Sequence, residues 1–496
     1  MELQNLADAA YPPHLKILNG AARKRVLEAE KAQDYYDGNF WRHIESEVIE
    51  WAHGGTLPKM HKEVSDYPSA KKSSSDLDYT PSKLQLRYPS FFIDEIASWL
   101  FENPIGLKME DEDAYALIEQ VHKDNKIDQK LLQSGVECSL THGIAVKVLW
   151  NDARKQIRTI FRPSRECFPI MDPDDVDIMQ KVHFCALQDD EKTVWRQTFE
   201  LIDGVCWVTE ALFAISSLKN ENPIPISKKS VPLYMGDTPI DFIPVTIIPN
   251  EPNLGEIWGR SDLEPLYVPI NEICRKMSDA SDALAFELFP ITLILNALES
   301  NVDDFSVAPG AVWELSGDKE NPADARKLES SMPVMPALES YVDRLLAMLH
   351  QFSGVPNVTR DKIDSVGAIS GIALKLMFTS IVSKCNRKAM YWKPGLQEVY
   401  DNVLRTAAVY QGFAYKPDRV VEITMTPRIP QNELEQLEIE AREIQMLVKK
   451  TIDVMKERGV ADPETYLAEV LAERGQIDEA ENPDIFGKEL EQEATE

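Results

Sequence analysis

Two long helical patterns that bracket a strand-like stretch constrain this chain more than any other feature. The first runs from Ser261 to Phe289, and the second begins at Pro336 and stops near Gly354. In both, apolar residues recur three and four positions apart, the spacing of one helix face. At 1.5 Å per residue the first helix would be about 40 Å long. The apolar positions are Leu263, Leu266, Tyr267, Ile270, Ile273, Cys274, Met277, Ala280, Leu284 and Leu288, then Leu338, Tyr341, Val342, Leu345, Leu346, Leu349 and Phe352.

The ends of the first helix carry their own signals. Ser261 and Asp262 are predicted to cap it, and Pro290 is predicted to end it. Pro265 fits the first turn, where a missing backbone N–H costs little. Pro269 is expected to bend or loosen the helix near its start.

The stretch between the two helices, 291–335, changes character. It contains a β-branched run (ITLIL), a Pro309-Gly310 turn, a second strand-like piece (AVWEL, 311–315) and then a polar loop. We expect a small α/β excursion here.

The remaining sequence predicts a mixed architecture. Up to about residue 255, helical pieces alternate with strand-like ones, and Asp203-Gly204 is predicted to be a hairpin turn. After a polar loop at 357–369, a long helical pattern from 370 to 411 is interrupted by Pro394-Gly395, which predicts a kink. Residues 420–426 are predicted to be a strand that closes back on the first module. The fold class is therefore α+β, mainly helical.

The last segment, 431–496, is helical in pattern and acidic, with 19 acidic and 7 basic residues. Seven of its residues alternate three and four apart, as in packed parallel helices. This pattern is too short to decide between helix association in an oligomer and a helix that packs on its own neighbours. The seven are Leu434, Leu437, Ala441, Ile444, Val448, Thr451 and Met455.

Length and charge limit the functional class. A chain of 496 residues is longer than the chains that usually fold around a single hydrophobic core. Its composition, with 44% hydrophobic and 27% charged residues, is typical of a soluble globular protein. The formal charge of −29 argues against tight wrapping of DNA, because such surfaces gain affinity from Lys and Arg. An acidic wall would still let a duplex slide past.

Cysteines and apolar segments indicate a cytosolic origin. The cysteines are scattered without a CxxC pair, so we expect them to be reduced and mostly buried. The N-terminus shows no secretion signal, and the most apolar stretch, 284–298, is too short to span a membrane. The six are Cys138, Cys167, Cys185, Cys206, Cys274 and Cys385.

Motifs for catalysis or metal binding are weak. There is no GxxxxGK[ST] motif, so the chain is not predicted to be an ATPase. The eight histidines show no HExxH or paired spacing, and Asp172–Asp177 (DPDDVD) lacks the glycine and distal glutamate of an EF-hand, which favours a turn. We predict no enzyme activity, no cofactor and no metal.

The order of these elements resembles the portal proteins of tailed bacteriophages, particularly the siphophage type of Gram-positive hosts. The densest similarity is GRSDLEPLYVPINEICRKMSDASDALAFELFP, Gly259 to Pro290, which resembles the family's segment leading into the stem. ISGIALKL, Ile369 to Leu376, is similar to the start of the family's long helix after its tunnel loop. Weaker similarities are FIDEIASWLFENPIGL, HGIAVKVL and RPSRECFP.

The resemblance implies a portal fold with wing, stem, clip and crown modules around a central channel. Its layout here is a wing at 1–255, stem helices at 261–289 and 336–354, a clip at 291–335, a tunnel loop at 355–369, a kinked long helix and closing wing strand at 370–430, and a crown at 431–496.

The resemblance also implies two functional regions. Arg360, Asp361, Lys362 and Asp364 would line the channel on the tunnel loop, unless they are only solvated loop charges. The clip, which in the family meets the packaging motor and adaptors, points to Asp303, Asp304, Trp313, Glu314, Lys319 and Glu320. Trp313 fits a contact anchor, and it fits a local core or a contact between subunits equally well.

The implied function is a homo-oligomeric ring, usually of twelve subunits, at one capsid vertex of a virion made in the host bacterial cytoplasm. Double-stranded DNA would pass through it without sequence-specific binding. Expected partners are the terminase large subunit, head-completion or adaptor proteins, and the major capsid and scaffold proteins, with no membrane. Two alternatives stay open: another oligomeric virion structural or adaptor protein, and a nuclease that uses clustered carboxylates.

Overall fold

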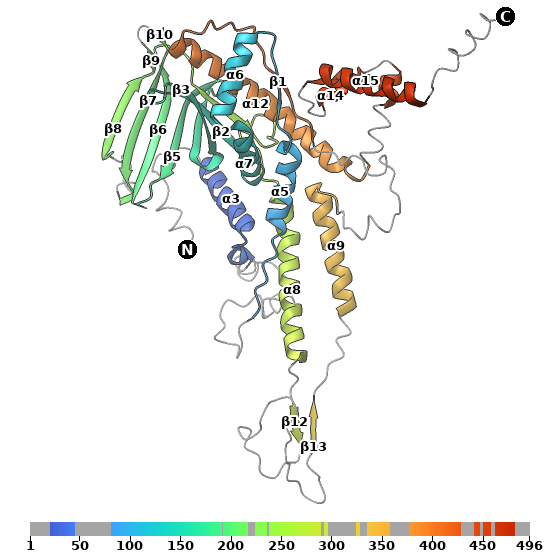
Figure 1. Ribbon diagram of the computed structural model, residues 1–496. Coiled ribbons are helices and arrows are strands. Elements are labelled where there is room, and N and C mark those ends of the chain that lie inside the picture. Colours follow the sequence, from blue (N-terminus) through green and yellow to red (C-terminus); the bar gives the residue numbers. More distant parts are fainter. Residues whose placement is uncertain are drawn as a thin grey trace, which may run out of the picture. The chain divides into compact units, whose positions relative to one another are not determined.

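The chain forms two compact units, the first of residues 1–359 and 378–428 and the second of residues 360–377 and 429–496. Their structure comes from a computed structural model (Figure 1). The described residues are 20–44, 81–190, 192–216, 224–235, 238–288, 292–295, 324–327, 335–357, 376–427, 441–446, 450–457 and 462–481.

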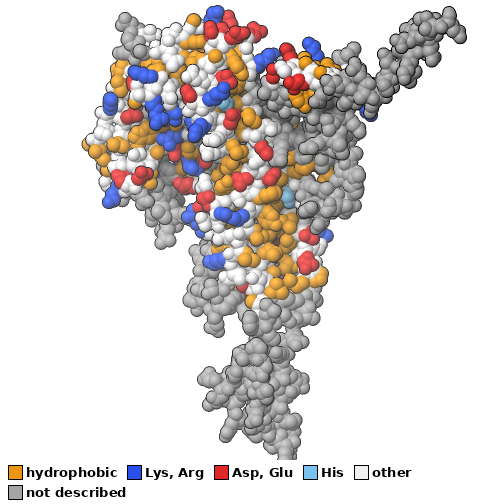
Figure 2. All heavy atoms as spheres, viewed as in Figure 1, with side chains coloured by type: hydrophobic (Ala, Val, Ile, Leu, Met, Phe, Trp, Pro, Cys, Tyr) orange, Lys and Arg blue, Asp and Glu red, His pale blue; other side chains and the backbone are white. Residues whose placement is uncertain are grey.

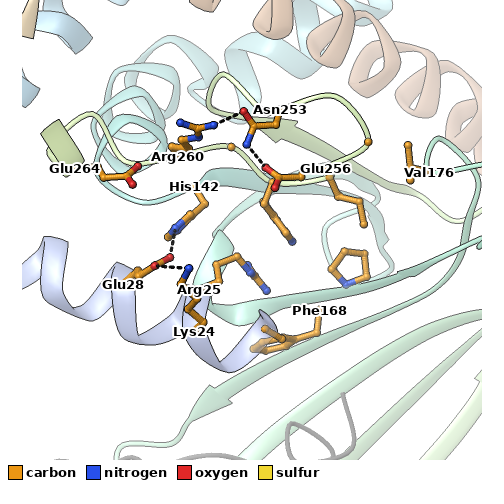
Figure 3. Close-up of a pocket in the computed structure, with 16 residues that line it drawn as sticks. Lys24, Arg25, Glu28, His142, Phe168, Val176, Asn253, Glu256, Arg260 and Glu264 are labelled. Atoms are coloured by element: carbon orange, nitrogen blue, oxygen red, sulfur yellow. Dashed lines mark hydrogen bonds and ion pairs between the residues drawn. The ribbon is translucent and has the colours of Figure 1, made fainter. Parts of the chain in front are cut away.

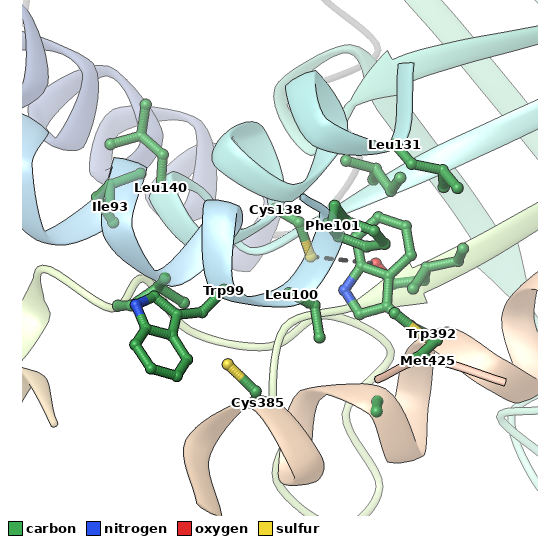
Figure 4. Close-up of a cluster of buried hydrophobic side chains, with 14 of the residues drawn as sticks. Ile93, Trp99, Leu100, Phe101, Leu131, Cys138, Leu140, Cys385, Trp392 and Met425 are labelled. Carbon is green, nitrogen blue, oxygen red and sulfur yellow. Dashed lines mark hydrogen bonds between the residues drawn. The ribbon is translucent and has the colours of Figure 1, made fainter. Parts of the chain in front are cut away.

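Five helices of the first unit pack against one another around its main apolar core. Phe101 and Trp392 meet edge to face with ring centroids 4.7 Å apart, and Cys138 and Cys385 lie in the same cluster (Figure 4). All six cysteines are free and buried, as predicted. The helices are α3 (Gly20–Asp37), α5 (Tyr88–Phe101), α6 (Glu112–Asp124), α7 (Ile127–Leu140) and α12 (Thr379–Gln411).

A three-stranded antiparallel sheet completes this core, in the order β11 (Val245–Pro249), β2 (Gly143–Asn151) and β3 (Gln156–Pro163). The first six residues of β2 are all buried, so both faces of the central strand are covered. Helix α12 packs on β11, where a Cβ on Gly395 would lie 2.6 Å from the Ile248 side chain. Glycine at this position therefore allows the helix and the strand to approach closely.

A second, five-stranded antiparallel sheet has the order β4-β5-β6-β7-β8. The turn between β6 and β7 is Asp203-Gly204, as predicted, and both residues have positive φ (50° and 75°), which a two-residue hairpin of this type requires. The strands are β4 (Cys167–Met171), β5 (Met179–Leu187), β6 (Thr193–Ile202), β7 (Val205–Ala214) and β8 (Ser227–Pro232). Two shorter ladders join β9 (Tyr234–Met235) to β10 (Thr238–Pro239), and β1 (Gly106–Lys108) to β14 (Glu422–Thr424).

Strand β14 pairs with β1, so the chain closes back on the module of residues 1–255, as the apolar pattern at 420–426 predicts. The acidic stretch Asp172–Asp177 is a turn, also as predicted: the Asp172 carboxylate accepts the backbone N–H of Asp174 and Asp175.

The helix predicted from Ser261 is observed with a different start. A 3-10 turn, Glu264–Leu266, precedes α8 (Tyr267–Leu288). Pro269 is the third residue of α8, where its missing N–H has no partner inside the helix, so the predicted bend has no cause there. Ser261 caps locally, since its hydroxyl accepts the Leu263 N–H at 3.2 Å. The predicted capping role of Asp262 is wrong, because its carboxylate pairs with lysines of α12.

Two predictions on strand and helix boundaries need correction. The strand predicted at 291–295 is observed as β12 (Thr292–Leu295), but its partner is β13 (Asp324–Lys327), a polar segment with no strand signal. The predicted strand at 311–315 lies outside the described residues. Helix α12 is also continuous through Pro394-Gly395. The side chains of Trp392 and Leu396, on either side of this pair, are buried in the core and hold the helix in place.

In the second unit, helices α14 (Thr451–Glu457) and α15 (Pro463–Glu481) pack on each other, and residues 441–445 are also helical. The helical character predicted for this region is thus observed where it is described.

Candidate functional site

The residues predicted to line a channel or to meet partners lie outside the described residues. They are Arg360, Asp361, Lys362 and Asp364 in one segment, and Asp303, Asp304, Trp313, Glu314, Lys319 and Glu320 in the other. The structure does describe the elements at which each segment begins and ends, and these constitute the candidate site.

The segment 296–323 is bracketed by a pair of helices. Helix α8 and helix α9 (Met335–Ser353) run side by side in opposite directions, and the β12–β13 ladder lies between them in the sequence (Figure 1). The Tyr341 hydroxyl donates to Glu272 at 3.4 Å, and Leu345 and Leu349 join the core that contains Ile270 and Ile273. The chain therefore runs out to the segment 296–323 along α8 and returns along α9, which together form one antiparallel pair.

Helix α9 ends in a tightly hydrogen-bonded turn. Gly354 has φ +77°, the left-handed conformation that favours glycine at a helix C-terminus, and its N–H donates to His350 O. The Ser353 hydroxyl accepts the Val355 N–H at 3.2 Å, and His350 Nδ1 lies 3.0 Å from Val355 O. This turn fixes the direction in which the chain enters 358–375.

A buried ion cluster, Asp262 with Lys384 and Lys388, joins that turn to the start of α12. Asp262 Oδ1 lies 3.1 Å from Lys384 Nζ, and Oδ2 lies 2.6 Å from Lys388 Nζ. Lys384 Nζ also donates to Ser353 O at 3.0 Å, and Lys388 Nζ donates to Asn250 Oδ1. The end of α9, the loop before α8 and the first turns of α12 are thereby held together.

Opposite charges stabilise the ionised forms in this Asp262 cluster. Burial alone would raise the pKa of Asp262, but the two ammonium groups lower it to about 2. Burial alone would likewise lower the pKa of Lys388, whereas Asp262 raises it above its usual value. The carboxylate of Asp262 and the ammonium group of Lys388 therefore stay charged at neutral pH, and the cluster ties the end of α9 to the start of α12.

Sequence reasoning missed this cluster, although a signal exists. Lys384 and Lys388 occupy the same helix face as the buried residues Ile381, Cys385 and Trp392. Lysines on an apolar helix face imply a buried anionic partner. The partner's identity could not be read from the sequence, since Asp262 lies more than a hundred positions away.

A separate pocket of about 610 Å³ lies beside α3 (Figure 3). Arg25 is buried there over the Trp258 ring, 4.5 Å from its centroid, and donates to Cys167 O at 2.9 Å. His142 Nε2 lies 3.3 Å from Glu28 Oε2, and burial lowers the pKa of His142. These groups bind to the protein's own carbonyl and carboxylate oxygens, so they hold α3 against the sheets.

Two searches of the described chain gave negative results. No group of three or more His, Cys, Asp or Glu side chains in the described ranges is arranged to hold a metal ion. None of the helices described there is both long and apolar enough to cross a bilayer.

Comparison with known families identifies the class of protein. The profile of the family "Phage portal protein, SPP1 Gp6-like" matches residues 15–480, nearly the whole chain. This chain belongs to the SPP1 Gp6-like phage portal family. As a member of this structural family, the portal protein is a virion component that assembles as an oligomer with capsid partners.

The other comparisons add little to the description of this portal protein. No curated protein sequence matches it. Among solved structures, a chain titled "Virion of native gene transfer agent (GTA) particle" is similar with 10% identity and a TM-score of 0.38, over 82% of the portal protein and 94% of that chain. The assignment therefore depends on the family profile.

Proposed function

We propose that this portal protein forms a ring at one capsid vertex and that double-stranded DNA enters and leaves the head through its centre. The family match over residues 15–480 carries this proposal. We further propose a ring of twelve subunits without enzymatic activity, in a siphophage of a Gram-positive host, made in the bacterial cytoplasm.

The Asp262 cluster supports a channel role for the predicted tunnel loop, 355–369. A loop that meets moving DNA needs fixed ends, since otherwise force on the loop would shift its helices. Here Lys384, near the start of α12, pairs with Asp262 and donates to Ser353 O at the end of α9, so the two helices that flank the loop are attached to each other. In the proposed ring, Arg360 and Lys362 make transient phosphate contacts that salt screens, while Asp361, Asp364 and the net charge of −29 keep the duplex from binding tightly.

The antiparallel pair α8–α9 supports a docking role for the segment 296–323. Such a pair projects whatever lies between its ends away from the core, here the β12–β13 ladder and the residues it brackets. We propose that this clip, with Asp303, Asp304, Trp313, Glu314, Lys319 and Glu320, contacts the terminase large subunit and later the head-completion proteins. In the same proposal residues 1–255 and 370–430 form the wing, which meets capsid and scaffold proteins, and 431–496 form the crown.

A charge-reversal experiment tests the channel. The double variant Arg360→Glu/Lys362→Glu should assemble into rings but package or retain less DNA, because repulsion replaces attraction at each passing phosphate. The measurement is the amount of nuclease-protected DNA per particle, together with electron micrographs of the rings.

The matched control is Arg154→Glu/Lys155→Glu, which reverses two exposed charges in the turn between β2 and β3. It should package normally. Normal packaging by the Arg360/Lys362 variant would refute the channel role of these residues, and equal loss in both variants would show a general charge effect.

A further inference from the structure

The open edge of strand β3 carries positive charge. In the sheet β11-β2-β3, β3 is the last strand, and the start of α7 covers part of its edge. Asn125 accepts the Thr159 N–H at 3.0 Å and donates to Ile157 O at 2.9 Å, and Lys130 Nζ donates to Thr159 O at 2.7 Å. These side chains satisfy the backbone of the edge and place Lys130 beside β3.

Beside this edge lies a pocket of about 440 Å³ between α7 and β3. Side chains of Arg158 and Arg162 project from the same face of β3, since alternate residues of a strand point the same way. Lys130 lines the pocket from α7. Figure 2 shows Lys and Arg side chains gathered on the face of the molecule that carries the sheets. A chain with a net charge of −29 thus has a locally basic cavity.

Two of the cations in this pocket have no carboxylate partner among the described residues. Arg162 pairs with Glu166 at 3.0 Å, and the only acid of the lining, Glu137, already pairs with Arg165 at 3.1 Å. Lys130 and Arg158 pair with no described acid, and they repel each other: burial and then the charge of Arg158 lower the pKa of Lys130. A bound anion would remove this repulsion.

We infer that this pocket binds a phosphate group, held by Arg158 and Lys130 with Arg162 at its border. A guanidinium presents paired donors that match phosphate oxygens, and an ammonium adds a point charge. Two cations without a carboxylate partner also suit an anion with at least one full negative charge, which a phosphodiester and a terminal phosphate both carry at pH 7. The site goes beyond the proposed channel and does not depend on it, because it lies in the sheet module.

Calorimetric titration of the full-length protein with inorganic phosphate, against chloride at equal ionic strength, tests this inference. The wild-type protein should bind phosphate saturably, and Arg158→Gln should weaken binding about tenfold, as expected for loss of a charge-assisted hydrogen bond. Arg158→Lys keeps the charge and should bind between these two. Thermal unfolding checks that each variant folds.

The matched control is Arg154→Gln, an exposed arginine in the turn before β3, which loses the same charge outside the pocket. It should bind phosphate as the wild type does. A second titration with a short DNA duplex identifies the source of the phosphate. If the duplex binds and Arg158→Gln weakens that binding, the site is supported and its ligand is the nucleic-acid backbone. If inorganic phosphate binds but the duplex does not, the site is supported and its ligand is a free phosphate. No phosphate binding beyond that of chloride, or equal weakening by Arg154→Gln, would overturn the inference.

Discussion

Helices α12 and α9 differ in how much of their surface this chain covers by itself. Helix α12 buries residues on several sides, including Trp392, Leu396 and Tyr400. Helix α9 buries only Leu345, Leu349 and Ser353, and leaves the aromatic and thioether side chains of Tyr341, Met348 and Phe352 about 40% exposed or more. The first helix is stabilised by its own subunit, whereas the second has an apolar face that the described residues of one copy leave exposed.

The difference separates two roles. Contacts of α12 should determine the free energy of unfolding of one chain, while the exposed face of α9 should matter when several chains assemble, as the proposed ring requires. Exposed apolar residues grouped on one helix are typical of interaction surfaces.

The largest effect is expected at the centre of α12. Trp392→Ala removes a ring that is 2% exposed and packs on Phe101, so the free energy of unfolding should fall by about 3–5 kcal/mol. Chemical denaturation followed by circular dichroism measures it. The control Met390→Ala, on the exposed side of the same helix, should change it by less than about 0.5 kcal/mol. Similar losses in both variants would contradict the packing described for α12.

The Asp262 cluster should give the next largest effect. Asp262→Asn leaves two buried ammonium groups without their carboxylate, which should cost about 3 kcal/mol at pH 7. The pKa of Asp262 is about 2 in the folded protein against an ordinary 3.8, so its stabilisation is present above about pH 4 and is lost as the pH falls towards 2.

The stability difference between wild type and Asp262→Asn should therefore shrink between about pH 4 and pH 2. Denaturation curves at several pH values measure it. A difference that does not change with pH would show that folding does not lower the pKa of Asp262.

A smaller effect is expected where α12 meets β11. Gly395→Ala places a methyl group 2.6 Å from Ile248, and overpacking of this kind costs about 1–3 kcal/mol. In a background that already carries Ile248→Ala, which removes both the Cγ1 and the Cδ1 atoms that the methyl group would meet, Gly395→Ala should recover part of its cost. Without such recovery, the close approach of helix and strand would not be the reason for glycine at this position.

The smallest effect on unfolding, with the largest on assembly, is expected on α9. Met348→Ser/Phe352→Ser should lower the free energy of unfolding by only about 1 kcal/mol, because both side chains are already about 40% exposed or more in one copy. Sedimentation velocity should nevertheless show fewer rings. Asp343→Ser on the same helix is the control, and intact rings in the double variant would place the subunit contacts elsewhere.

Local patterns predicted much of the fold. The spacing of Leu345 and Leu349 indicates α9, Gly354 indicates its end, and Asp203-Gly204 indicates the hairpin, since each signal depends on neighbouring residues. Strand β13 was missed because DARK has no apolar alternation, so only its pairing with β12 makes it a strand.

Long-range pairings could not be predicted in the same way. Asp262 has the sequence position of a helix cap, and only the folded chain brings Lys384 and Lys388 to it. The unneutralised pair Lys130 and Arg158 comes from α7 and β3, which the sequence does not place side by side. The residues predicted for the channel and the clip stay predictions.

An electron cryo-microscopy map of the purified full-length protein tests the central claim most directly. The account predicts rings in which the pair α8–α9 repeats around one axis and the segment 358–375 faces the axial opening. Particles without a common axis, or rings in which that segment faces outward, would contradict it.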